Sequence, residues 1–174
     1  MPVTIDGTAG ITYPAGTGVQ SVGATLMTAV ASTSGTSIDF TGIPAGVKRV
    51  TVMFNGVSTN GASIKLVQVG SGSVSTSGYI STSSNVSSVA LTTSSTAGFV
   101  IYSNNASDVI SGSIVLTLIS GNTWVASHSV KAATTISVFG SGDISLGGAL
   151  DRVRITTVNG TDTFDAGSIN VLYE

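Results

Sequence analysis

Cysteine is absent from the 174 residues, and charged residues make up only 8% of them. Without cysteine the chain can form no disulfide, thiol nucleophile or thiolate metal site. Average soluble domains carry about 25% charged residues, so hydroxyl and amide groups must solvate most of this surface. Six basic and eight acidic residues give a net charge of −2, which provides no basic footprint for nucleic acid or anionic lipid. We therefore expect no nucleic-acid partner.

Long apolar runs and an early basic segment are also absent. The first basic residue is Lys48, so the start lacks the positive region of a secretory signal. No apolar run approaches the ~20 residues of a membrane span. We expect a chain that is made in the cytoplasm without processing and that does not insert into a membrane.

Short apolar stretches take the place of helical periodicity. Hydrophobic residues are 41% of the chain and its mean hydropathy is +0.47, enough apolar material to offset the entropy of folding. In VTVMFNG (50–56), Val50, Val52 and Phe54 alternate with other side chains, and an Asn-Gly turn pair ends the segment. This alternation predicts a half-buried strand whose inward residues are Val50, Val52 and Phe54.

Segments of this kind recur along the chain and are separated by Gly, Ser and Asn. Nine or ten short strands predict an all-β fold, namely a β-sandwich of jelly-roll type in one domain. Residues 1–22, rich in Gly and Pro, are expected to form an extended arm, residues 23–174 the sandwich, and residues 70–97 irregular strands and a long loop. The predicted strands are 37–43, 50–56, 63–70, 98–103, 112–120, 123–130, 134–140, 150–158 and 168–174, with 25–32 as a weaker candidate.

His128 is the only histidine, and a Ser/His/Asp hydrolase would have to use it. It is flanked by serines, but serine is frequent here and no G-x-S-x-G elbow occurs. Alternation with Trp124, Ala126 and Val130 indicates a polar edge position on a half-apolar face. The Gly-rich stretches 70–73 and 140–143 lack the remaining elements of a phosphate loop. We expect no catalytic residue and no bound cofactor.

Asp162 and Asp165 are the only close pair among seven Asp and one Glu, which is little material for a glycosidase. Their spacing does not match the alternating ligands of a calcium loop. We expect Asn159–Gly160 to end a strand and 162–167 to form a corner whose carboxylates accept backbone N–H groups, without a metal. In the strand that follows, Ile169, Val171 and Tyr173 should share one face.

The aromatic residues allow two interpretations. A single Trp among few aromatics, Trp124, is more often part of a core than a sugar platform. The alternative is a carbohydrate-binding surface on which Trp124, Tyr79 and Tyr102 stack against sugar rings.

Three segments resemble small tailed-bacteriophage structural proteins of the tail-fibre type: TSIDFTGIPAGVKRVTVMFNGVSTNGAS (36–63), GNTW (121–124) and LDRVRITTVNGTDTFDAGSINVLYE (150–174). AGITYPAGTGVQ (9–20) is similar to the Gly-Ile-Thr-Phe-Pro-x-Gly-Thr segments of phage fibres, with Tyr13 in place of Phe and Ala15 in place of Asp. The resemblance implies a non-enzymatic, β-rich virion component, expected to be a homotrimer displayed on the particle.

Three functions therefore stay open at this point. The first is a tail-fibre or adhesin module mounted through residues 1–22, and the second is a capsid decoration protein that cements the head. Their partners would be further copies of the chain and other virion proteins, from the tail or the major capsid shell. The third is a carbohydrate-binding module for a host-surface glycan.

Overall fold

The computed structural model describes residues 4–6, 10–12 and 23–174. None of these residues forms a helix, so the described chain contains no helix that could cross a membrane. Strand β1 (Thr4–Asp6) pairs with β2 (Gly10–Thr12) in an antiparallel hairpin ahead of two larger sheets. Apart from this hairpin, the predicted arm over 1–22 lies outside the described residues.

The larger sheet has nine strands in the order β10-β9-β14-β13-β12-β6-β16-β3, with β4 also paired to β16. Its neighbouring strands are antiparallel, and β12, β13 and β14 form a meander. Its members are β3 (Thr25–Leu26), β4 (Val30–Ala31), β6 (Arg49–Thr59), β9 (Ile80–Val86), β10 (Ala90–Ser95), β12 (Ile110–Ser120), β13 (Thr123–Ala133), β14 (Ile136–Ser145) and β16 (Phe164–Tyr173).

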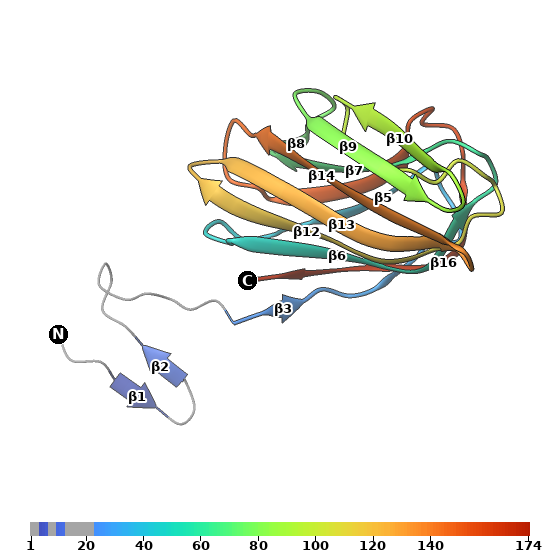
Figure 1. Ribbon diagram of the computed structural model, residues 1–174. Helices are drawn as coiled ribbons and strands as arrows, with labels where there is room; N and C mark the ends of the chain where they lie inside the picture. Colours follow the sequence, from blue (N-terminus) through green and yellow to red (C-terminus); the bar gives the residue numbers. More distant parts are fainter. Residues whose placement is uncertain (1–3, 7–9, 13–22) are drawn as a thin grey trace.

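The smaller sheet has five strands and packs against one face of the larger sheet, which gives a β-sandwich (Figure 1). The order is β11-β7-β15-β5, with β8 paired to β7. The chain crosses between the two sheets several times, for example from β5 to β6, from β6 to β7 and from β14 to β15. The predicted all-β sandwich is therefore confirmed. The members are β5 (Ser37–Thr41), β7 (Lys65–Ser71), β8 (Ser73–Val74), β11 (Phe99–Ile101) and β15 (Arg152–Thr157).

The core lies between the sheets and follows the alternation of apolar residues along each strand. Val50 and Val52 are fully buried and Phe54 is 5% exposed, so the predicted inward face of β6 is confirmed. On β16, Ile169 and Val171 are buried and Tyr173 packs against the same cluster. The smaller sheet contributes, among other residues, Val67, Val69, Val153 and Ile155.

Strand β9 reverses the usual pattern of burial. Its inward residues include Ser81 and Ser83, both buried, whereas outward-facing Ile80 is 71% exposed. The Ser81 hydroxyl accepts the N–H of Val100 at 3.0 Å, and the Ser83 hydroxyl accepts the N–H of Tyr102 at 3.1 Å. These hydroxyls therefore satisfy backbone donors of the β11 segment in the opposite sheet, since buried N–H groups need acceptors.

We predict that Phe54→Ala lowers the free energy of unfolding by about 3 to 5 kcal/mol, because it removes a buried ring and leaves a cavity. Asn55→Ala, at the exposed neighbouring position, should change this free energy by less than about 0.5 kcal/mol. Urea denaturation measures both. A loss under about 1 kcal/mol for Phe54→Ala would place the ring outside the core.

Candidate functional site

His128 lies inside the sandwich on a central strand, which corrects the predicted edge position. Strand β13 is flanked by β12 and β14, and His128 is 7% exposed. Its Nε2 atom is 3.1 Å from the hydroxyl of Ser83, which is fully buried. Burial lowers the pKa of His128 to about 4, so the imidazole is neutral near pH 7. The serine–histidine pair is therefore not presented at the surface of the sandwich.

Gly140 makes this contact possible because it lies between the two partners. The register places His128 opposite Gly140 on β14, and Gly140 opposite Ser83 on β9. A Cβ atom on Gly140 would lie 2.2 Å from Cε1 of His128 and 2.4 Å from the carbonyl oxygen of Thr82. The imidazole thus crosses β14 where a side chain is missing, and the glycine serves packing rather than phosphate binding.

The three aromatic residues considered for sugar stacking do not form a common platform. Trp124 is 2% exposed and Tyr79 is 1% exposed, so neither presents a ring face to a sugar. The Tyr79 hydroxyl accepts the N–H of Val69 at 2.7 Å, and burial raises its pKa to about 12. Tyr102 is only partly buried. The stacking hypothesis is therefore wrong for Trp124 and Tyr79, because both rings complete the core.

The aspartates near the C-terminus lie around a corner between β15 and β16. Asp162 accepts the N–H of Ser63 at 2.8 Å and the side-chain amide of Asn159 at 2.7 Å. These hydrogen bonds lower the pKa of Asp162. Asp165 already belongs to β16 and accepts the hydroxyl of Ser58, so the corner covers 158–163 and ends before the predicted 167. Over 23–174 and the β1–β2 hairpin, no group of three His, Cys, Asp or Glu residues could hold a metal ion.

Lys65 is a buried cation to which the sequence analysis gave no role. It begins β7 and is 1% exposed, and its Nζ atom has no hydrogen-bond partner among the described residues. Burial lowers the pKa of Lys65, whereas nearby Asp108, Asp162 and Asp165 raise it. The signal in the sequence was alternation: Lys65 shares the inward face of β7 with Val67 and Val69.

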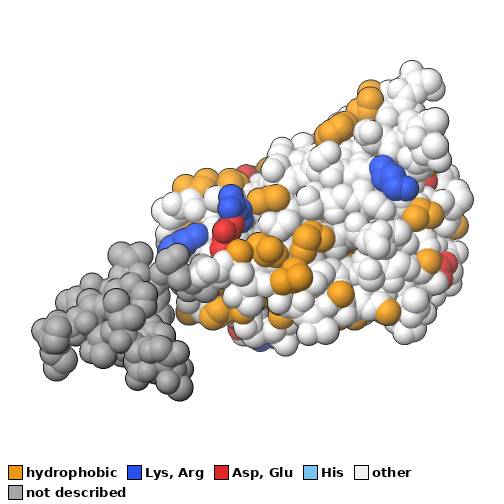
Figure 2. All heavy atoms as spheres, turned by 90° about the horizontal axis from the view of Figure 1, so that it is seen from below, with side chains coloured by type: hydrophobic (Ala, Val, Ile, Leu, Met, Phe, Trp, Pro, Cys, Tyr) orange, Lys and Arg blue, Asp and Glu red, His pale blue; other side chains and the backbone are white. Residues whose placement is uncertain are grey.

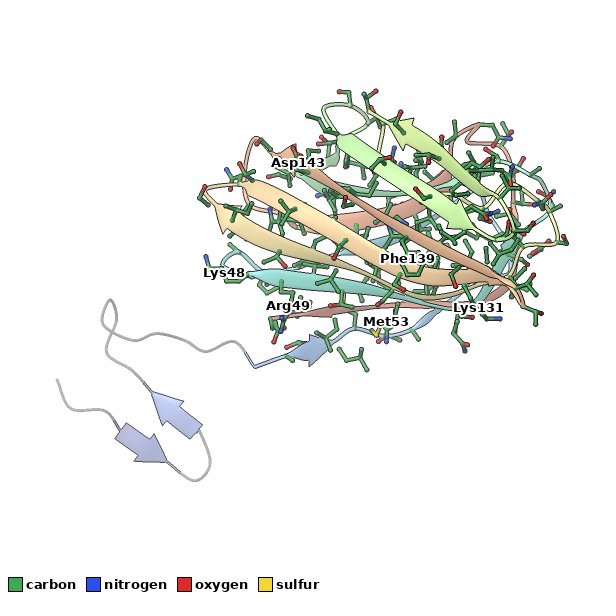
Figure 3. All side chains as sticks on the ribbon, in the orientation of Figure 1. Lys48, Arg49, Met53, Lys131, Phe139 and Asp143 are labelled. Atoms are coloured by element: carbon green, nitrogen blue, oxygen red, sulfur yellow. The ribbon has the colours of Figure 1, made fainter. Side chains whose placement is uncertain are left out.

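The outer face of the larger sheet is broad and rich in hydroxyl groups. One cross-strand row runs from Met53 through Ser113 and Ser129 to Phe139 and Ser84. Figure 3 shows Met53 and Phe139 over this sheet, and the Phe139 side chain is 48% exposed. The neighbouring row contains Thr51, Val115, Ser127, Ser141 and Thr82.

Charged side chains are few on this outer face. On the strands from β6 to β14, alternation places only Arg49, Lys131 and Asp143 there (Figure 3). The outer face of the smaller sheet differs, because Arg154 forms two hydrogen bonds to Asp39, at 2.6 and 2.8 Å. On the larger sheet, Arg49 at the start of β6 is paired with Glu174, so the ion pair of this face lies at one end of the strand.

Exposed apolar side chains continue at the β3 edge of the larger sheet. Leu26 on β3 is 60% exposed and pairs with Leu172 on β16. Figure 2 shows apolar side chains gathered on the face seen from below, where charged side chains are sparse. The outer face and this edge together form the candidate interaction surface, and they contain no arrangement of acids and bases typical of catalysis.

The chain matches no family model, no curated protein and no solved structure. Only the surfaces and contacts of the described residues therefore bear on its function.

We predict that Gly140→Ala lowers the free energy of unfolding by about 1 to 3 kcal/mol, because the new Cβ overlaps the His128 ring and a rigid backbone carbonyl. Gly147→Ala is the matched control, since a Cβ there meets nothing within 4 Å. It should leave stability unchanged or raise it by up to about 1 kcal/mol. Equal stability of both variants in denaturant melts would contradict the packing of His128 over Gly140.

We predict that Asp162→Asn destabilises the corner at about pH 7 and that this difference disappears in acid. The folded-state pKa of Asp162 lies below its ordinary value of 3.8. Its stabilising contribution is therefore present above that value and is lost as the pH falls through the folded-state pKa. Thermal melting of both proteins across this range measures the effect.

The same proteins test the competing calcium site. Added calcium should leave both melting temperatures unchanged, because the Asp162 oxygens already accept hydrogen bonds within the corner. A rise confined to the wild-type protein and reversed by chelator would contradict the corner assignment, since a saturated site stabilises by mass action.

Proposed function

We propose that the chain is a non-enzymatic structural protein of a bacteriophage particle, in which it forms a homotrimer of β-sandwiches as a tail-fibre or adhesin module. The proposal combines the resemblance of segments 36–63, 121–124 and 150–174 to such proteins with the character of the outer face. The buried state of His128 and the hydrogen-bonded state of Asp162 favour a structural role over an enzymatic one.

The observation that carries the proposal is the difference between the two outer faces. The outer face of the smaller sheet holds ion pairs of Arg152 and Arg154 along β15, as a solvated surface does, whereas the pair of Arg49 with Glu174 lies at the end of β6. The outer face of the larger sheet presents hydroxyl groups with Met53, Val115 and half-exposed Phe139 among them. Depletion of charge around a central aromatic residue is typical of the buried centre of protein interfaces.

Cyclic association would cover this face in every copy. Contact between the outer face of one copy and a different surface of the next closes a ring when the rotation fits. A ring with any number of copies would cover this face. The number three is taken from the resemblance to phage fibre proteins. A capsid decoration protein would use the same trimer, so the position on the particle separates these two functions.

We predict that the wild-type chain has about three times its monomer mass of 17.2 kDa in light scattering, and that Phe139→Glu lowers this mass to that of one chain. A charge at the centre of a desolvated contact opposes association. Val158→Glu is the matched control, since Val158 is 60% exposed in the corner after β15. It should leave the mass unchanged.

A monomeric wild-type chain would contradict the trimer, and an unchanged mass in Phe139→Glu would place the contact elsewhere. Position on the particle is tested separately by disrupting purified particles, separating heads from tails and detecting the chain by immunoblot. Recovery with tails supports the fibre module, recovery with heads supports decoration, and absence from both contradicts the virion assignment.

A further inference from the structure

Strand β10 forms an open edge of the larger sheet. It pairs over six residues with β9, without a register shift, and no described strand lies on its other side. None of its residues is buried, charged or a proline. Natural sheets block such edges with charged residues, prolines, bulges or very short strands, because an open edge pairs readily with another chain. Strand β10 has none of these features, so its edge can accept a further strand.

The other sheet edges of the sandwich are each protected. On the opposite side of the larger sheet, β3 and β4 contain two residues each. In the smaller sheet, β5 carries Asp39, which is held by Arg154, and β8 and β11 contain two and three residues. The N–H groups of Val100 and Tyr102 are already accepted by serine hydroxyls of β9. Among the described strands of the sandwich, β10 is therefore the edge best suited to accept a partner.

The backbone groups that β10 presents can be assigned from one hydrogen bond. The Thr82 hydroxyl on β9 donates to the carbonyl of Thr93 at 3.1 Å, so this carbonyl lies on the β9 side of β10. Successive residues of an antiparallel strand direct their N–H and C=O groups to opposite edges. Ala90, Thr92 and Ser94 therefore direct theirs to the open edge, where an incoming strand would pair with them.

The β1–β2 hairpin of the same chain lacks a neighbouring strand. Its register runs from Thr4 opposite Thr12 to Asp6 opposite Gly10, and among the described residues it joins neither sheet of its own copy. Two antiparallel strands alone are marginally stable in water, and a third strand or a packed partner is needed. The chain therefore contains both an open edge that lacks a strand and a hairpin that lacks an edge.

The length of the connection favours docking between copies. The hairpin is connected to β3, which lies at the opposite margin of the larger sheet from β10 (Figure 1). Neighbouring strands are about 4.8 Å apart, so the seven intervals from β3 to β10 span roughly 34 Å across the sheet. The eleven steps from Thr12 to Gly23 reach at most about 40 Å when fully extended. Docking within one copy would require almost full extension around the sandwich, whereas β10 of a neighbouring copy can lie close to the β3 margin.

We infer that the β1–β2 hairpin of each copy pairs with the open edge of β10 in a neighbouring copy and extends its larger sheet. The inference rests on the proposed ring of copies, and it supplies a second head-to-tail contact of the kind that such a ring uses. A strand of three residues forms few hydrogen bonds, so this pairing adds to the contact around Phe139 and does not replace it.

Cross-linking between single cysteines tests the exchange, because the natural chain contains no cysteine. One full-length chain carries Thr12→Cys in β2 and a second carries Thr92→Cys in β10. The two chains are co-expressed and treated with a short bismaleimide. The expected product has twice the chain mass of 17.2 kDa on a denaturing gel, and its yield exceeds that from either variant expressed alone.

Thr41→Cys is the matched control for the cysteine on β10, since Thr41 is an exposed threonine on β5, an edge strand of the smaller sheet. Co-expressed with Thr12→Cys, it should give no such product. Equal yields with Thr92→Cys and with Thr41→Cys, or no product with either, would overturn the inference.

A proline on the open edge provides a second test, with Ser94→Cys as the reporting position on β10. Thr92→Pro removes the N–H group that this residue directs to the open edge and leaves the bonds to β9 in place. The cross-link to Thr12→Cys should fall by about fivefold or more, a factor equivalent to one lost hydrogen bond. An unchanged yield, in a variant whose melting temperature equals that of its parent, would overturn the assigned edge.

Light scattering on the cross-linking samples before treatment separates this inference from the proposed trimer. A trimeric mass without the cross-link would overturn the hairpin exchange alone. A monomeric mass without the cross-link would contradict the trimer as well. The cross-link in samples of dimeric mass would support the exchange and contradict the number three.

Discussion

The backbone donors at the edge of the smaller sheet impose the constraint on which much of the interior depends. Strand β11 ends that sheet, so the N–H groups of Val100 and Tyr102 face the larger sheet without a neighbouring strand. Ser81 and Ser83 accept them, which requires polar side chains on the inward face of β9. Because Ser83 also contacts His128 across Gly140, one arrangement accounts for the buried serines, the buried histidine and the glycine between them.

The same arrangement affects the outer surface. With serines turned inward, the apolar side chains of β9 face outward, and Ile80 and Val86 are 71% and 45% exposed. Phe139 on the neighbouring strand lies on the same outer face. Association of copies through this face would cover apolar residues that the hydrogen bonding of the interior has turned outward. The buried serines of β9 and the exposed apolar residues that the proposed assembly would cover therefore both follow from the alternation of residues along this strand.

Alternation predicted the strands wherever apolar residues face inward. The segments around Val52, Ile155 and Val171 were recognised in this way, and the inward face of β6 was assigned residue by residue. Alternation could not predict β9, because its burial pattern is reversed and depends on backbone donors in the opposite sheet. It could not predict β10 either, because this strand contains no buried residue. The candidate surface was likewise beyond reach, since it combines residues that only the pairing of strands brings together. The resemblance to phage proteins does not concern this surface.

Two buried nitrogen atoms, Nζ of Lys65 and Nε1 of Trp124, have no hydrogen-bond partner among the described residues. Burial lowers the pKa of Lys65, whereas the charges of Asp108, Asp162 and Asp165 raise it, so the protein itself offsets part of the cost of burying this side chain. Trp124 is neutral and its ring packs in the core cluster, so the apolar contacts of the ring offset the cost of its unpaired N–H group. The interior therefore meets the two burial costs differently, by electrostatic attraction for Lys65 and by packing for Trp124.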